Sequence, residues 1–215
     1  MKMAKAILVT CMVSMLLACA QQVTRPGKVL VVVRDGSENL ERAILKELDP
    51  MIQTLKSARL TVVLATSTGE PVTIGQASLA PDTTLEAVVV TDYDGVIIPC
   101  MASTLSMPDS IAVAVKAVEE KIPLATGDGA IRVLRDGGLL KGRRYALDPT
   151  FADSVQEGTN MGTGVVQDGL LITAGACPND TYDKTRKDQT KELTVTFIKA
   201  VRERIRTVQA KANGT

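Results

Sequence analysis

The chain has 215 residues, a length that suits one domain with a full-sized core, and 45% of its residues are apolar. Its 25 basic residues nearly balance 24 acidic ones, which argues against nucleic acid as a partner. Aromatic residues make up only 2%, so stacking on bases or sugars is not expected, and the absence of His removes the commonest general base and transition-metal ligand.

The first 18 residues are predicted to be a signal peptide rather than part of the fold. Two lysines precede an apolar stretch, residues 6–18, which is too short to span a bilayer. The sequence LLAC at 16–19 resembles the lipobox of bacterial lipoproteins, which implies that Cys19 is lipidated and becomes the mature N-terminus. Ordinary cleavage after Ala20 is the alternative, and a buried N-terminal helix is a weaker one because of the flanking charges.

We therefore expect residues 19–27 to form a lipid-anchored tether and residues 28–215 to form the domain. The lipobox places the protein in the cell envelope, held to a membrane through its lipid and facing the periplasm or the exterior. Export also implies an oxidising compartment, where disulfides persist.

Apolar runs separated by turn residues predict strands that alternate with helices. The run KVLVVV is typical of a strand that is buried on both faces. Strands are expected at residues 28–33, 60–65, 72–74, 94–99 and 122–126, with a hairpin over residues 165–173 around Asp168-Gly169. Helices are expected at residues 38–56, 108–121, 130–136 and 189–212. This alternation predicts an α/β fold, a three-layer α/β/α sandwich with a mostly parallel sheet.

Sites in such sheets lie beyond the carboxyl ends of the strands. Four stretches around these ends resemble the ThiJ/PfpI family, which shares a flavodoxin-like fold with class I glutamine amidotransferases. They are KVLVVVRDGSENLE at 28–41, DYDGVIIP at 92–99, KIPLATGDGAIRVLRDGGLLKGR at 121–143 and VVQDGLLIT at 165–173. The resemblance covers nearly all of the chain after residue 27.

The family's nucleophile is a Cys on a sharp strand-to-helix turn, in a pattern like A-x-C-H-G. Here the turn reads ATGDG, which puts Gly127 at the Cys position and Asp128 at the His position. A nucleophile on such a turn is commonly held in a strained conformation costing about 1–3 kcal/mol, which a glycine relieves. The resemblance thus implies a degenerate nucleophile turn, with Asp128 expected to cap the following helix and to oppose an incoming anion.

Other parts of the family's site also differ from its pattern. Glu41 matches the family's acidic residue, which hydrogen-bonds the thiol, but it has no thiol to bond at position 127. The alternative is a glutamate at a helix start that makes a structural hydrogen bond. The glycines of a P-G-G pattern are replaced by Cys100 and Met101, and the final loop is GACPND at 175–180. Without His there is no Ser-His-Asp triad, and without a Cys-x-x-Cys pair we expect no structural zinc, no other metal and no cofactor.

Two functions remain open. The first is a non-catalytic binding or scaffolding domain whose ligand is a small molecule or a protein. The second is a cysteine-dependent hydrolase or glyoxalase-type enzyme with a relocated site, using Cys100 or Cys177 as nucleophile and Glu41 or Asp128 as base.

The resemblance also places the nucleophile turn between Cys100 and Cys177. The two cysteines are hypothesised to form a disulfide across that vacated site. The alternative is a pair of buried free thiols, because Cα atoms on strands that flank a third start about 9–10 Å apart. Family members often dimerise, so the resemblance alone implies a homodimer.

Overall fold

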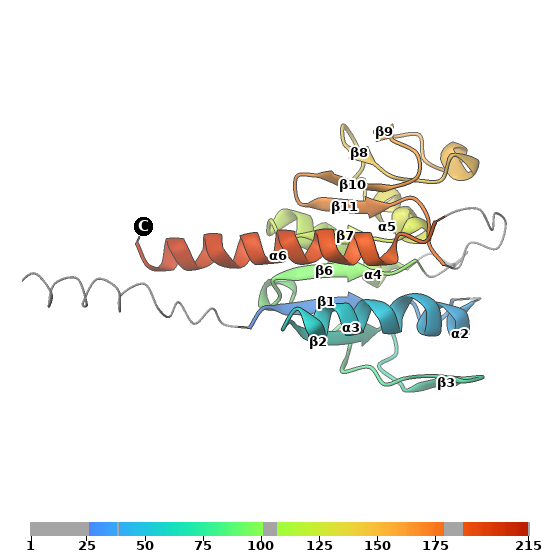
Figure 1. Ribbon diagram of the computed structural model, residues 1–215, viewed down its shortest axis with the longest axis horizontal. Coiled ribbons are helices and arrows are strands. Elements are labelled where there is room, and N and C mark those ends of the chain that lie inside the picture. Colours follow the sequence, from blue (N-terminus) through green and yellow to red (C-terminus); the bar gives the residue numbers. More distant parts are fainter. Residues whose placement is uncertain (1–25, 38, 101–106, 179–186, 215) are drawn as a thin grey trace, which may run out of the picture.

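The protein folds around a twisted central sheet with helices on both faces. The computed structural model describes residues 26–37, 39–100, 107–178 and 187–214 (Figure 1). The predicted signal peptide and Cys19 lie outside these residues. Within the described residues, no helix combines the length and the hydropathy needed to cross a membrane.

The main sheet has seven strands in the order β10-β11-β7-β6-β1-β2-β5, and every pair is parallel except β10 with β11. Its strands are β1 (Lys28–Val32), β2 (Thr61–Thr66), β5 (Thr83–Thr84), β6 (Gly95–Ile98), β7 (Leu124–Thr126), β10 (Val165–Asp168) and β11 (Leu171–Ala174). Two small ribbons stand outside it, β3 (Val72–Ile74) with β4 (Ala77–Leu79) and β8 (Arg144–Tyr145) with β9 (Thr159–Asn160).

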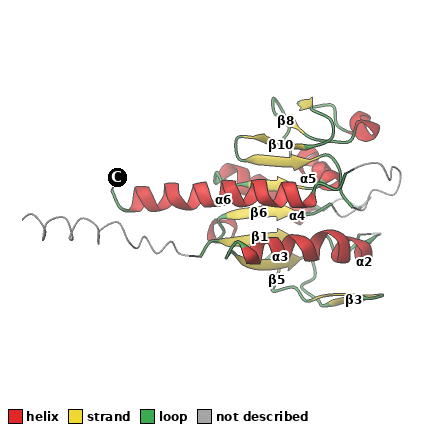
Figure 2. Cartoon of the chain, viewed as in Figure 1, coloured by secondary structure: helices red, strands yellow, loops and turns green. Residues whose placement is uncertain are grey.

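The helices form the outer layers of the sandwich (Figure 2). The α-helices are α2 (Leu40–Ala43), α3 (Asp49–Ser57), α4 (Pro108–Glu119), α5 (Ile131–Asp136) and α6 (Thr190–Ala212). A π-helical turn, η1 (Ile44–Leu48), joins α2 to α3, and short 3-10 turns lie at η2 (Val90–Asp92), η3 (Asp128–Ala130) and η4 (Pro149–Ser154). The first predicted helix is therefore a composite of α2, η1 and α3.

The continuous apolar run of β1 is explained by two separate cores. Val29, Val31 and Val33 face the helices α2, α3 and α6, whereas Leu30 and Val32 face α4 and α5. Successive side chains on a strand point to opposite faces, so a strand covered on both sides has no polar face. The predicted α/β/α sandwich and its parallel sheet are confirmed, as is the hairpin, in which Gly169 has a φ of +61°.

Candidate functional site at the carboxyl edge of the sheet

Three neighbouring strands end at one edge of the sheet and bring the predicted site residues there. The strand β7 lies between β6 and β11, and all three run parallel. Cys100 follows β6, Gly127 follows β7 and Cys177 follows β11. The middle strand thus carries the turn to which the sequence resemblance assigns the family's nucleophile, with one cysteine on each side.

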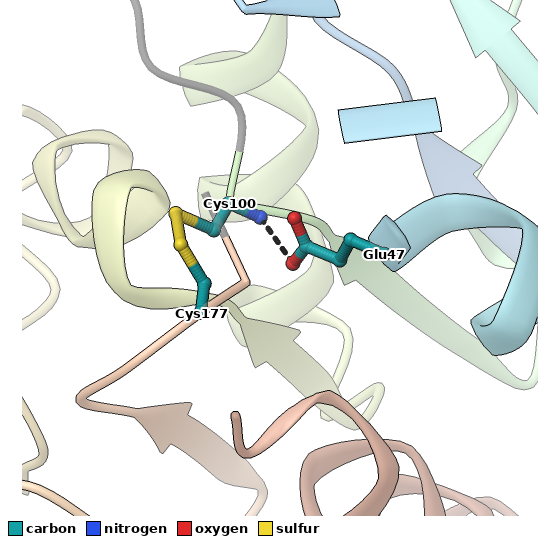
Figure 3. A group of neighbouring side chains, drawn as sticks. All are labelled: Glu47, Cys100 and Cys177. Carbon is teal, nitrogen blue, oxygen red and sulfur yellow. Dashed lines mark hydrogen bonds between the residues drawn. A yellow bond between two sulfur atoms is a disulfide. The ribbon is translucent and has the colours of Figure 1, made fainter. Parts of the chain in front are cut away.

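Cys100 and Cys177 are joined by a disulfide that bridges the two outer strands, and both side chains are buried (Figure 3). Their Cα atoms are 6.3 Å apart. Strands separated by one other strand would place them about 9–10 Å apart. The segments after β6 and β11 therefore converge above β7, within the usual Cα range of a disulfide.

Cys100 occupies the space that a side chain at position 127 would need. A Cβ atom built on Gly127 would lie 2.5 Å from the backbone nitrogen of Cys100 and 2.8 Å from its Cβ. Real Cβ atoms do not approach other heavy atoms so closely, so any larger residue here must push Cys100 away.

The expected reason for glycine at position 127 is wrong. Gly127 has φ −72° and ψ 167°, an extended conformation that any residue adopts. Backbone strain does not select glycine here. The close approach of Cys100 does.

Asp128 is not at the N-cap position of the helix α5 that follows it. It is the first residue of η3, and α5 begins only at Ile131, preceded by Ala130, which makes no side-chain cap. The buried Asp128 Oδ1 instead accepts a long hydrogen bond, 3.4 Å, from the backbone N–H of Asp148. The carboxylate therefore ties the turn after β7 to the segment before η4.

Glu41 contacts the β3–β4 ribbon instead of the cysteines. Its Oε1 accepts a hydrogen bond of 2.8 Å from the backbone N–H of Gln76, and its carboxylate lies against Gly75. The acid that hydrogen-bonds a site cysteine is Glu47, in the π-helical turn. Of the two roles expected for Glu41, an acid or base and a structural hydrogen bond, the contacts show the structural hydrogen bond.

Glu47 lies beneath the disulfide with only 1% of its surface exposed. Its Oε1 accepts a hydrogen bond of 2.7 Å from the backbone N–H of Cys100 (Figure 3). Burial raises the pKa of Glu47 to about 8, and this outweighs the lowering by the Cys100 N–H and by Arg34. Near neutral pH the carboxyl therefore holds its proton and remains a hydrogen-bond acceptor for Cys100.

A sequence signal for Glu47 was present but was not used. The buried side chains of the composite helix recur at i, i+3, i+4 and i+7, the spacing of an apolar face. Glu47 falls within this series, one turn after Ala43 and Ile44 and one turn before Met51. A carboxylate on an apolar stripe indicates a buried acid, whatever the family pattern assigns to Glu41.

Arg34, just beyond β1, is the second buried ionisable residue of this edge and was also missed. It is 2% exposed, and burial lowers its pKa to about 10 although Glu47 attracts its charge. An ion pair alone would raise the pKa of Arg34 and lower that of Glu47. Both pKa values move the other way, so the cost of removing the two groups from water outweighs their mutual attraction.

The Arg34 guanidinium lies beside the turn after β7. Its Nε and Nη2 atoms are buried with no hydrogen-bond partner within the described part of the chain. A Cβ built on Gly129 would lie 3.8 Å from Arg34 Nη2 and 3.2 Å from Cys100 Sγ. The Gly129 N–H donates to Cys100 Sγ at 3.1 Å. The Gly129 N–H thus contacts this sulfur, and the Arg34 guanidinium lies near the same turn.

The geometry also creates a group of potential metal ligands that the sequence analysis did not expect. One ligand atom each from Glu47, Cys100 and Cys177 lie within 4.8 Å of one another, and all three residues are buried. They come from η1, from the end of β6 and from the end of β11. Met101, Asn179 and Asp180, singled out from the sequence, lie outside the described residues.

The sandwich, the strand order and the turn after β7 define an α/β protein built like the ThiJ/PfpI domains. The DJ-1/PfpI family profile matches residues 27–185, and the chain belongs to this family. No curated protein matches the chain significantly.

Solved structures with this fold are similar over most of their length. A ThiJ/PfpI domain protein from Brachyspira murdochii is 12% identical with a TM-score of 0.67, covering 83% of this chain and 98% of that one. The putative protease I from Bacteroides thetaiotaomicron is 14% identical with a TM-score of 0.62, covering 81% and 99%. Drosophila melanogaster DJ-1beta is 22% identical with a TM-score of 0.60, covering 87% and 97%. At these identities the likeness establishes the fold alone.

Proposed function

We propose that this protein is a non-catalytic member of the DJ-1/PfpI family, an exported, lipid-anchored domain that binds or scaffolds a partner in the cell envelope. The observation that carries the proposal is the contact over Gly127. A side chain at the nucleophile's position would lie 2.5 Å from the Cys100 backbone nitrogen, so the fold has no place for one.

The remaining groups at this edge also favour binding over catalysis. Covalent catalysis by cysteine needs a thiolate, and both cysteines of the site are held in the disulfide. The chain has no His to act as base. Glu47 accepts a hydrogen bond from the Cys100 backbone, where it supports the bridge.

Activity assays test the loss of catalysis. Wild-type protein and a Gly127→Cys variant are compared in glyoxalase, deglycase and peptidase assays. Neither should turn over substrate. The wild type has both site cysteines in the disulfide, and in the variant a cysteine at 127 displaces Cys100 and has no neighbouring His. Turnover by the wild type, or clear turnover by Gly127→Cys above it, contradicts the proposal.

The lipid anchor is supported by the LLAC sequence and by the charge of the surface beside Gly27. Gly27 borders a hollow of about 420 Å³ whose lining includes Arg59, Arg202 and Arg206. Positive side chains beside the tether favour electrostatic attraction to anionic lipids.

A Cys19→Ala variant tests this anchor. It should lose lipid labelling and no longer sediment with membranes, while Cys11→Ala, within the leader, serves as the matched control. Lipid labelling that survives in Cys19→Ala would show that another residue is the anchor.

The homodimer remains a second proposal, based on the family resemblance, and sedimentation velocity tests it.

A cysteine-dependent enzyme is the second candidate, favoured by the surroundings of Cys100 Sγ. The Gly129 N–H and the buried Arg34 charge would both stabilise a thiolate there once the disulfide is reduced. Iodoacetamide labelling of the reduced, native protein distinguishes the candidates. A thiol at Cys100 that reacts fast at neutral pH, together with turnover, supports the enzyme, and an inert thiol supports the binding domain.

A further inference from the structure

We propose that reduction of the Cys100–Cys177 disulfide opens a zinc site made of two thiolates and the Glu47 carboxylate. This inference does not rest on the lipid anchor or on the loss of catalysis. The three ligand atoms lie within 4.8 Å of one another, and the three residues are brought together from positions 53 and 77 residues apart along the chain. Figure 3 shows the carboxyl group and the two sulfur atoms on either side of the Cys100 backbone.

The backbone separation suits both states of the cysteines. Tetrahedral zinc with Zn–S distances of about 2.3 Å places two sulfur atoms roughly 3.8 Å apart. A disulfide holds them at about 2.05 Å, so each sulfur has to retreat by less than about 1 Å. Rotation of the two side chains supplies this movement while the Cα atoms stay 6.3 Å apart.

The charge around the three ligands suits a buried zinc complex. Two thiolates and one carboxylate bound to Zn²⁺ leave a net charge of −1, which is costly to bury without a counter-charge. Arg34 is 2% exposed and supplies this positive charge, and its Nε and Nη2 donors have no partner within the described residues. The Gly129 N–H, 3.1 Å from Cys100 Sγ, is the kind of outer hydrogen bond that orients a metal-bound thiolate.

The donor set favours Zn²⁺ among the common cations. Thiolate ligands disfavour Mg²⁺ and Ca²⁺, which prefer oxygen, and a carboxylate beside them suits Zn²⁺ better than the softer Cu⁺. Three protein ligands leave the fourth tetrahedral position to a water molecule.

The redox step balances with a dithiol as reductant. The dithiol gives two electrons and two protons to the Cys100–Cys177 bond and leaves as its own disulfide. Zn²⁺ then replaces the protons of the two thiols and the proton of the Glu47 carboxyl, and all three protons pass to solvent. When a disulfide oxidant takes the two electrons back, the bridge forms again and the zinc is released.

The test uses the full chain with Cys11→Ser and Cys19→Ser, so that Cys100 and Cys177 are its only thiols. Zn²⁺ binding is measured by competition with a chromophoric chelator, first on the oxidised protein and then on the same protein reduced by a dithiol. We expect no stoichiometric binding to the oxidised form and one Zn²⁺ per chain for the reduced form, tighter by at least 100-fold. Equal binding by the two forms, or none by the reduced form, overturns the proposal.

Variants identify the ligands. Glu47→Gln and Cys177→Ser should each weaken Zn²⁺ binding by the reduced protein at least 10-fold, whereas Glu41→Gln, the matched control, should leave it unchanged. Unchanged binding by Glu47→Gln overturns the three-ligand site.

A readout on the unsubstituted site guards against variants that do not fold: Co²⁺ bound to the reduced protein should show thiolate charge-transfer bands and intense tetrahedral d–d bands. Octahedral, thiolate-free Co²⁺ spectra would contradict it.

Discussion

Two glutamates six positions apart on the first helical segment have opposite surroundings. Glu41 reaches outward to the β3–β4 ribbon and bonds the backbone of Gln76. Glu47 points inward, is 1% exposed, and bonds the backbone of Cys100 beneath the disulfide. We call the first the outer flap contact and the second the inner floor contact.

The difference shows how helical phase overrides a match of residue type. Six positions turn an α-helix by about 600°, which places the two side chains on different faces. The π-helical turn η1, which contains Glu47, shifts this phase further. Substitutions around the inner floor contact, at the disulfide and at Gly127, should therefore change the free energy of unfolding strongly. Substitutions at the outer flap contact should change it weakly.

The largest expected effect on the free energy of unfolding comes from losing the disulfide above the inner floor contact. The bridge closes a sequence separation of 77 residues, and the chain-entropy relation gives roughly 4–5 kcal/mol for a loop of this length. Cys177→Ser should lower the free energy of unfolding in urea by about this amount under oxidising conditions. In the presence of a reductant and a chelator, wild type and variant should converge. Equal stabilities of both oxidised proteins would show that the bridge stabilises nothing.

The next effect is steric. Gly127→Ala places a Cβ against the Cys100 backbone and should destabilise the oxidised protein by about 1–3 kcal/mol. Gly36→Ala is the matched control, because a Cβ there meets nothing within 4 Å, and it should stay within about 0.5 kcal/mol of wild type. Similar urea midpoints for the two variants would refute the close approach of Cys100 to the turn.

Glu47 should also give the protein a pH-dependent stability. The pKa of Glu47 is raised from its ordinary 4.5 to about 8 in the folded protein, so between these values the folded chain holds a proton that the unfolded chain has released. Stability from this residue is therefore full below pH 4.5 and is lost as pH rises through 8. In chelator, Glu47→Gln should flatten that decline from pH 5 to 8, because the amide oxygen still accepts from Cys100 without titrating. If the stability of Glu47→Gln declined with pH as steeply as that of the wild type, the decline would come from other titratable groups.

The smallest effect should come from the outer flap. Glu41→Gln keeps an acceptor for the Gln76 N–H, and Glu41→Ala removes it at a cost of about 0.5–1.5 kcal/mol. Both variants should keep the pH profile of the wild type. If Glu41→Ala lowered the free energy of unfolding more than Gly127→Ala does, the outer flap contact would matter more for stability than the inner floor contact, against this account.

The fold was predictable because its signals repeat along the whole chain. Continuous apolar runs, glycine turns and alternating helical segments each indicate the same parallel sheet, and Lys28–Val32 and Leu171–Ala174 occur where they were expected. The two-residue strands β5, β8 and β9 were not predicted, because so few residues carry no periodicity.

The candidate site was predictable in position but not in detail. Strand order places Cys100, Gly127 and Cys177 together, but side-chain direction, backbone approach and helix phase decide what each residue does. The expected reason for Gly127 was therefore wrong, the N-cap position of α5 is Ala130 and not Asp128, and Glu41 makes a structural hydrogen bond. Arg34 and Glu47 were missed because they are charged residues buried by contacts between distant segments.

Peptide mapping without reduction tests the central claim most directly. The protein is isolated from the cells that produce it, its free thiols are alkylated during acid quench, and it is digested. We predict a linked peptide pair that contains Cys100 and Cys177, with no alkylation at either residue. Alkylation of both cysteines, with no linked pair, would contradict a disulfide that closes the edge over Gly127.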